Sequence, residues 1–299
     1  NSGASIWYPP SVDDAGNIYF GTGNPAPFPG NNGETRPGPN LYANSMVSLD
    51  TVEGSVRWYV QAAPHDVLDH DFQQSPVLVK TSINGRDMNL AIGAGKTGTV
   101  IAANADTGRV IWEIQVGEHN EYGDGAPLPA TPVTVLPGTY GGVESPMAFA
   151  NDTLFVPVLN LASKFSATEW DVPSALQDAT GELLAINVAD GSIKWSASLP
   201  TFTSAAATVA GDVVLTGGLD GIIHGYHVET GDEVWTYQTP AGLNAPLTVA
   251  GDLLLVAAGS PYYVHSANPP TPELQLVAMK LGGSDNGTPV ALPPLPSGS

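Results

Sequence analysis

The sequence contains no cysteine among its 299 residues. This absence excludes a disulfide framework, a zinc site with thiolate ligands and a cysteine nucleophile. It also excludes a haem held by a Cys-x-x-Cys-His motif, so the chain carries no covalently attached haem as an electron acceptor. The absence leaves the cellular compartment open, because many secreted proteins also lack cysteine.

Basic residues are scarce, with 9 lysines and arginines against 29 aspartates and glutamates and a net charge of −20. A nucleic-acid-binding protein needs a basic face that replaces the counterions of the phosphates, so this class is disfavoured. Docking on anionic lipid is disfavoured for the same reason. A strongly acidic, lysine-poor surface favours a periplasmic or extracellular location.

Long hydrophobic runs are also missing, since the best one, residues 253–258, has only the length of a strand. A membrane-spanning helix needs about 20 apolar residues, so the sequence predicts no membrane span. The chain starts at Asn1 with neither methionine nor a basic-plus-apolar leader. We interpret it as a processed chain or a fragment.

Glycine and proline are abundant, with 34 and 27 residues, about a fifth of the chain. This composition favours a turn-rich fold over a helical bundle. Four segments share one ending, in which a glycine stands four residues before a tryptophan: 50–58, 105–112, 189–195 and 229–235. Alternating apolar residues precede each turn, so each segment is predicted to be a β-hairpin.

A further strand pair is predicted upstream of each hairpin, and a fifth unit near the C-terminus lacks the final tryptophan. The unit length is about 40 residues, with the largest insertion between Trp112 and Thr180. Four-stranded units of this length are typical of β-propeller blades. We therefore predict an all-β chain, a single propeller domain over residues 1–299 with about five blades and a loose tail at 282–299. The repeated tryptophans are interpreted as packing between blades.

One acidic segment interrupts the repeat, Pro64-His-Asp-x-x-Asp-His-Asp71. Asp69 and Asp71 project from the same face if this segment is extended, and their charges repel unless a cation or a proton compensates. Carboxylates with an amide oxygen form a ligand set for a hard cation. The residues alone leave two interpretations open, a metal site and an ordinary acidic surface loop.

The whole chain resembles the later part of a pyrroloquinoline quinone (PQQ) dependent alcohol dehydrogenase, an eight-bladed propeller. The resemblance rests on ordered motifs: Gly21-Thr-Gly-Asn-Pro-Ala-Pro27, Arg36-Pro-Gly-x-Asn-Leu-Tyr42, Pro64-His-Asp-x-x-Asp69 and Lys96-x-Gly98. The blade endings are shared with non-enzymatic propellers and are weaker evidence. The resemblance implies oxidation of a primary alcohol with PQQ and a calcium or lanthanide ion as cofactors.

The resemblance also implies a role for several residues. Asn24 matches an amide ligand of the metal, Asp69 matches the base that also approaches the metal, and Asp71 matches the extra carboxylate of lanthanide-dependent members. Lys96 matches the cation that hydrogen-bonds the quinone oxygens. From the residues alone, Asn24 is equally a turn residue and Lys96 a solvated lysine.

Two further positions are matched more loosely. Trp7 lies near the position of the tryptophan on which the cofactor stacks, although it is equally a residue packed between blades. Asn160 matches a polar residue near the quinone.

The chain also departs from the family pattern. A glutamate metal ligand and several cofactor contacts come from blades upstream of Trp7 in the family, and the vicinal cysteine pair is missing here. Leu68 stands where the family has a tryptophan before the catalytic aspartate. The segment Phe202-Thr-Ser-Ala-Ala206 stands where the family has tryptophan-glycine-glycine, so a second tryptophan near the cofactor is also missing. The departures leave two interpretations open. Either a larger ring, a partner chain or self-association completes the propeller, or the ring closes differently and the cofactor site is vestigial.

Two functions follow from the sequence. The first is a PQQ- and metal-dependent alcohol dehydrogenase, or a fragment of one, that uses a small alcohol and an external electron acceptor such as a cytochrome. The second is a non-catalytic PQQ-like propeller that serves as a binding or assembly scaffold.

Overall fold

A computed structural model describes residues 3–28, 36–122, 127–168, 170–171, 176–260 and 275–282. In this part of the chain there are five four-stranded antiparallel sheets and one three-stranded sheet. The predicted all-β class and the division into five blades are confirmed. The predicted tail after residue 282 lies outside the described residues. No helix in the described ranges is long and apolar enough to cross a membrane.

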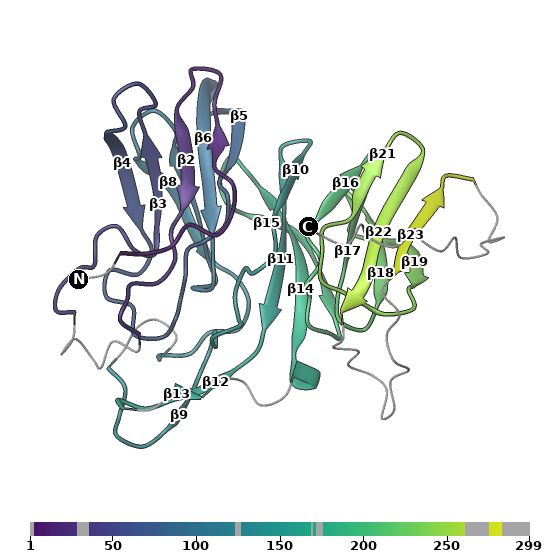
Figure 1. Cartoon of the computed structure of the whole chain (residues 1–299). Coiled ribbons are helices and arrows are strands. Elements are labelled where there is room, and N and C mark those ends of the chain that lie inside the picture. Colours follow the sequence, from purple (N-terminus) through teal and green to yellow (C-terminus); the bar gives the residue numbers. More distant parts are fainter. Residues whose placement is uncertain are drawn as a thin grey trace, which may run out of the picture.

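The five four-stranded sheets are blades that follow one another in chain order, from purple to yellow in Figure 1. Blades 1 and 2 consist of β1 (Ser11–Val12), β2 (Ile18–Gly21), β3 (Ser45–Leu49) and β4 (Val56–Gln61), then β5 (Val77–Ile83), β6 (Arg86–Ala94), β7 (Thr99–Asn104) and β8 (Val110–Gln115). Blade 3 consists of β10 (Ala148–Ala150), β11 (Thr153–Asn160), β14 (Thr180–Asn187) and β15 (Ile193–Leu199).

Blades 4 and 5 complete the described series. They consist of β16 (Thr208–Ala210), β17 (Val213–Gly217), β18 (Ile222–His227) and β19 (Glu233–Gln238), then β20 (Gly242–Leu243), β21 (Thr248–Ala250), β22 (Leu253–Ser260) and β23 (Gln275–Lys280). In blade 5, β22 pairs with all three other strands.

Alternation along the strands fills the spaces between blades. In β11, Leu154 and Val156 belong to the apolar cluster shared with blade 2, whereas Phe155 belongs to the cluster shared with blade 4. All three side chains are fully buried. Successive side chains of a strand point to opposite faces, so β11 contributes to the interfaces on both sides of blade 3. Its sequence is therefore a continuous run of apolar residues.

The tryptophans of the first three hairpins pack on the turn of the next blade, whereas Trp235 of the fourth hairpin is 39% exposed. Trp58 donates its indole N–H to Ala105 O at 2.9 Å, and its ring lies 2.7 Å from the position that a Cβ on Gly108 would occupy. Gly108 has φ +71°, so the turn needs glycine both for its backbone and for this contact. The same contacts recur with Trp112 on Val188 and Gly191, and with Trp195 on Val228 and Gly231.

The insertion predicted after Trp112 forms the small three-stranded sheet. Its strands are β9 (Val133–Val135), β12 (Ser163–Phe165) and β13 (Trp170–Asp171), and a 3-10 turn, Leu176–Asp178, leads back to blade 3. Val135 and Phe165 pack on Leu68 in one buried apolar cluster. The insertion therefore supports the acidic segment between β4 and β5.

Candidate functional site

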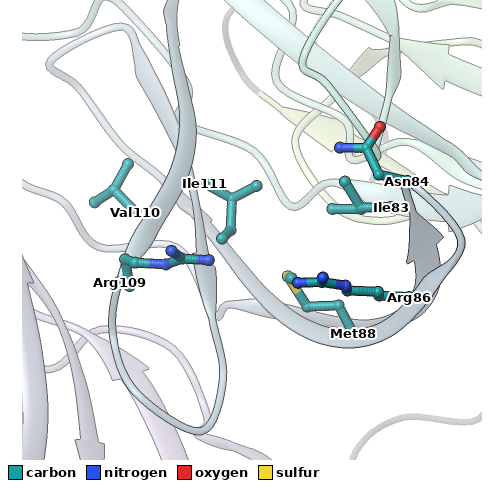
Figure 2. Close-up of a pocket in the computed structure, with 7 residues that line it drawn as sticks. All are labelled: Ile83, Asn84, Arg86, Met88, Arg109, Val110 and Ile111. Atoms are coloured by element: carbon teal, nitrogen blue, oxygen red, sulfur yellow. The ribbon is translucent and has the colours of Figure 1, made fainter.

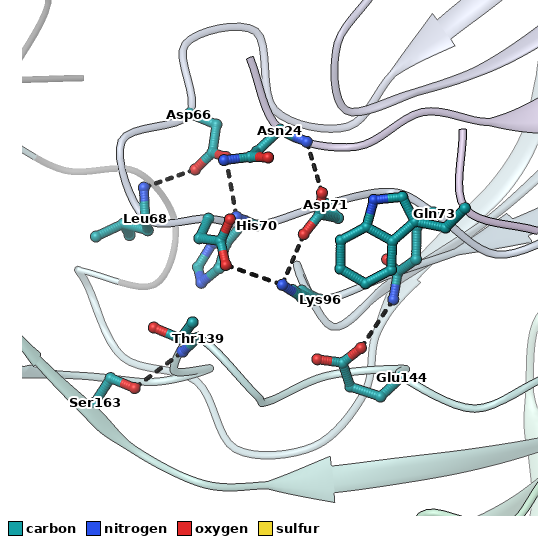
Figure 3. A network of polar contacts seen from close by, with 12 residues as sticks. Asn24, Asp66, Leu68, His70, Asp71, Gln73, Lys96, Thr139, Glu144 and Ser163 are labelled. Atoms are coloured by element: carbon teal, nitrogen blue, oxygen red, sulfur yellow. Dashed lines mark hydrogen bonds and ion pairs between the residues drawn. The ribbon is translucent and has the colours of Figure 1, made fainter. Parts of the chain in front are cut away.

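The predicted site residues come from loops at one end of blades 1 and 2. Asn24 follows β2, Asp69 and Asp71 lie between β4 and β5, and Lys96 occupies the turn between β6 and β7. The structure brings these four residues together, as Figure 3 shows for the three that it labels.

Lys96 is the centre of this cluster, which we call the Lys96 cluster. Its Nζ lies 2.7 Å from Asp71 Oδ2 and 3.0 Å from Asp69 Oδ2, and its side chain is only 3% exposed. Nζ also lies 4.8 Å from the centroid of the Trp7 ring, at cation–π distance. Burial disfavours the ammonium, but the surrounding carboxylates outweigh it and raise the pKa of Lys96. The lysine is a buried cation and not a solvated turn residue.

Asp71 is fully buried and uses both carboxylate oxygens. Oδ1 accepts a hydrogen bond from the backbone N–H of Asn24 at 2.6 Å, and Oδ2 pairs with Lys96. A Cβ on Gly23 would lie 2.6 Å from Oδ1, so the close approach of these two loops requires glycine. Asn24 thus joins the cluster through its backbone.

Asp69 is the more accessible of the two carboxylates. Its side chain is 21% exposed, and its φ of +63° is a left-handed conformation that is uncommon for a residue other than glycine. Burial raises the pKa of Asp69 to about 6, opposed by Lys96 and reinforced by Asp71. Its carboxylate is therefore mostly ionised at neutral pH.

Asp66 holds the segment that presents Asp69. Its Oδ1 accepts from Leu68 N at 2.8 Å, and its Oδ2 accepts from His70 N at 2.9 Å and from Asn44 Nδ2 at 3.1 Å. These bonds fix the backbone on both sides of Asp69. Strain at such a position persists only when the surroundings impose it, and this network imposes it.

The same segment is attached to the rest of the protein by two further contacts. His70 Nε2 lies 2.9 Å from the carbonyl oxygen of Pro137, so this nitrogen carries the proton. Burial lowers the pKa of His70, which keeps the ring neutral at neutral pH. Arg36 donates to Asp66 O at 2.6 Å. Sequence reasoning placed Asp66 and Arg36 in motifs but assigned them no role.

Trp7 differs from the blade tryptophans. Its side chain is 49% exposed, and its Nε1 donates to Ser5 Oγ at 2.8 Å. It is therefore a half-exposed aromatic surface beside Lys96, not a residue packed between blades.

Asn160 lies at the end of β11 and has other partners. Its Oδ1 accepts from Glu118 N at 2.8 Å, and its Nδ2 donates to Glu182 Oε1 at 3.1 Å. Within the described ranges, these bonds link blade 3 to the loop after β8 and do not join the Lys96 cluster.

Glu144 belongs to the cluster and was missed by sequence reasoning. Its Oε2 accepts from Gln73 Nε2 at 3.1 Å, whereas its Oε1 is buried and has no hydrogen-bond partner among the residues that the structure describes. Burial raises the pKa of Glu144 to about 8, although Lys96 opposes this shift. The only sequence signal is an acid in an otherwise uncharged stretch, 137–151.

A separate depression lies at the outer edge of blade 2, with a volume of about 580 Å³. Figure 2 shows Arg86 and Arg109 among the side chains that line it. None of the predicted site residues contributes to this depression, so it is not part of the Lys96 cluster.

Comparison with known proteins agrees with this architecture. The family described as glucose/ethanol/alcohol dehydrogenase, beta-propeller domain, matches residues 1–136, which include every residue of the cluster except Glu144. The family described as outer membrane protein assembly factor BamB matches residues 96–284. The second match covers more than half of the chain, which therefore belongs to the PQQ-type β-propellers, and the chain is similar to the PQQ-dependent alcohol dehydrogenases.

Individual relatives show how much of the family the chain represents. The quinoprotein alcohol dehydrogenase PedH of Pseudomonas putida is 28% identical over 77% of this chain and 44% of its own length. The lanthanide-dependent methanol dehydrogenase of Methylorubrum extorquens is 24% identical over 76% of this chain and 44% of its own length. The chain therefore spans about half the length of these relatives.

Solved structures show the same fold. The quinohemoprotein alcohol dehydrogenase ADHIIG from Pseudomonas putida superposes with a TM-score of 0.80, over 98% of this chain and 51% of that one, at 18% identity. The quinohemoprotein alcohol dehydrogenase from Comamonas testosteroni gives a TM-score of 0.73 over 86% and 45%, at 24% identity.

Proposed function

We propose that this chain is part of a PQQ- and metal-dependent alcohol dehydrogenase and carries its catalytic base. The observation that supports the proposal most is the convergence of Asp69 and Asp71 on the buried Lys96 beside Trp7. A scaffold does not need three ionisable side chains buried together, because burial of charge is costly.

Within the described ranges no three histidine or acidic side chains are already arranged to hold a metal ion, so the proposal of a multivalent cation rests on the charge and the oxygen donors of the Lys96 cluster. The carboxylates of Asp69 and Asp71 face a single ammonium, and Glu144 Oε1 is a further buried oxygen without a partner in the described part of the chain. The excess of buried negative charge and oxygen acceptors suits calcium or a lanthanide. Asn24, Asp69 and Asp71 would hold this ion.

The residues also fit one side of a flat cofactor. Trp7 would stack on it, and Lys96 would hydrogen-bond its oxygens. When bound, PQQ accepts the hydride that leaves the carbon of the alcohol.

Asp69 would take the proton of the alcohol hydroxyl. Its pKa of about 6 leaves it ionised at neutral pH yet basic enough to accept a proton. Its partial exposure gives the hydroxyl access, and the Asp66 network holds the carboxylate in one orientation. Before a cation is bound, the ion pair with Lys96 stabilises the ionised form of Asp69.

The experiment is reconstitution of the chain with PQQ and either calcium or lanthanum, followed by dye reduction with a series of primary alcohols. We expect retained quinone absorbance and alcohol-dependent dye reduction, with at least about a hundredfold loss in Asp69→Asn. Asp14→Asn is the matched control, because Asp14 is exposed and remote from the cluster. Retention of no quinone, or unchanged activity in Asp69→Asn, would contradict the proposal.

The electron acceptor, such as a cytochrome, and the periplasmic or extracellular location belong to the same proposal. They are supported by the family of the chain and by its acidic composition. The rest of the ring is proposed to come from further blades, a partner chain or self-association.

A scaffold function is the second candidate. It is favoured by the match of residues 96–284 to the outer membrane assembly family, since these blades contain neither Asp69 nor Asp71. It predicts that both aspartates can be replaced by asparagine without effect on binding of a partner protein, which a pull-down with the variant would measure.

A further inference from the structure

The backbone of Lys96 is fixed between two neighbouring segments. Lys96 N donates to Asp71 O at 2.8 Å, and on the other side Val143 N donates to Gly95 O at 2.9 Å. A Cβ on Gly95 would lie 2.2 Å from Asp71 O, so these strands approach as closely as glycine allows. These contacts hold the backbone of Lys96 on both sides, so we expect its ammonium to change position by rotation of the side chain.

Acidic side chains flank Lys96 from both of these segments. Asp71 comes from one, and Glu144 directly follows Val143 in the other, so that Figure 3 shows Lys96 between the two carboxylates. The ammonium is bonded on the Asp71 side, where Asp69 is its second partner. On the other side, Gln73 holds Glu144 by one oxygen, and the second oxygen is buried and unpartnered within the described residues.

We propose that the Lys96 side chain has two positions, one on Asp69 and Asp71 and one on Glu144, and that a cation bound by the two aspartates moves it to Glu144. The inference rests on the proposed function, because it assigns Glu144 a role in loading the same metal. It also removes a conflict between two proposed roles of Asp69 and Asp71, as ion-pair partners of Lys96 and as metal ligands, because both roles need the same carboxylate oxygens.

The physical reason is the cost of a buried, unpaired charge. An ion that takes the oxygens of Asp69 and Asp71 leaves a buried ammonium beside a new positive charge. Glu144 Oε1 is a buried acceptor that has no partner among the described residues, and rotation about the four side-chain torsions of Lys96 would bring Nζ to it. Gln73 keeps the receiving carboxylate in place.

The first test is a double-mutant cycle on metal affinity. Terbium bound near Trp7 is excited through the indole, so its luminescence reports binding without any turnover. Glu144→Gln should weaken terbium binding by about tenfold in the native background and by less than about threefold in the Lys96→Met background. If Glu144→Gln weakened terbium binding by the same factor in both backgrounds, Glu144 would act only through its electrostatic field or as a direct ligand. This result would overturn the inference.

The second test needs no metal. A crystal structure of the variant Asp69→Asn/Asp71→Asn should show Lys96 Nζ within hydrogen-bond distance of Glu144 Oε1. If Nζ stays between residues 69 and 71, the inference is wrong. If the native chain binds no terbium, the proposed function fails, and this crystal structure alone decides whether Lys96 has two positions.

Discussion

The contacts between blades and the Lys96 cluster are built on opposite principles. Between blades, one arrangement recurs three times, with a tryptophan ring on a turn glycine and a single indole hydrogen bond to a carbonyl. The Lys96 cluster occurs once, and it combines a buried ammonium, buried carboxylates and an aspartate with positive φ. The repeat determines the architecture, and function is to be sought where the repeat is interrupted.

The two regions also differ in what stabilises them. The interfaces gain free energy from burial of apolar rings, whereas the Lys96 cluster places like charges together and depends on its surroundings. This difference predicts which substitutions reduce stability and which reduce ligand binding.

The largest effect on stability is expected at the interfaces. Trp112→Ala should lower the free energy of unfolding by about 3–5 kcal/mol, because a buried ring and its hydrogen bond to Val188 are both lost. Urea denaturation measures the change. Trp235→Ala is the control, because Trp235 is 39% exposed against 8% for Trp112. Equal losses of unfolding free energy in the two variants would contradict the claim that burial of Trp112 between two blades stabilises the fold.

A smaller loss is expected in the segment that supports the site. Asp66→Ala leaves the backbone N–H groups of Leu68 and His70 without an acceptor, which should cost about 2–3 kcal/mol. Because these bonds fix Asp69, terbium affinity should also fall. Asp106→Ala is a matched control on an exposed turn. A variant with native stability and native affinity would refute a positioning role for Asp66.

A third prediction concerns pH. The folded pKa of Glu144 is about 8, above its ordinary value of 4.5, so the folded state binds this proton more tightly than the unfolded state. The contribution to stability is therefore present at low pH and is lost as the pH rises toward 8. The native chain should lose stability as the pH rises from about 4.5 to about 8, and Glu144→Gln should lose less over this range. Parallel curves for the two proteins would contradict this assignment.

The smallest effect is expected for an exposed ion pair. Lys80 pairs with Asp14, but both side chains are more than three-quarters exposed. Lys80→Ala should leave the urea midpoint unchanged within error, because solvent screens such pairs. A clear decrease in the urea midpoint would contradict the expectation that exposed ion pairs contribute little to stability in this protein.

The fold was largely predictable from the sequence, because a turn glycine followed four residues later by a tryptophan marks four of the five blades. Three of these tryptophans pack on the turn glycine of the next blade. The resemblance assigned Asn24, Asp69, Asp71 and Lys96 to one site, and the structure brings their loops together with Asn24 contributing its backbone N–H. The roles assigned to these residues stay predictions.

Three details of the site could not be predicted, because each depends on contacts between distant loops. Glu144 reaches the cluster only because a close backbone approach brings residue 143 beside Gly95. Asn24 donates its backbone N–H to Asp71, and a backbone contact of this kind cannot be predicted from the identity of the side chain. Asn160 bonds with Glu118 and Glu182, whose proximity follows from the packing of the loop after β8 on blade 3.

The most direct measurement is a crystal of this chain soaked in lanthanum chloride, with diffraction data collected where lanthanum scatters anomalously. We predict one strong anomalous peak between the carboxylates of Asp69 and Asp71, within reach of the Asn24 amide oxygen. No peak there, with Lys96 still bridging both aspartates at high lanthanum concentration, would contradict the metal-dependent function.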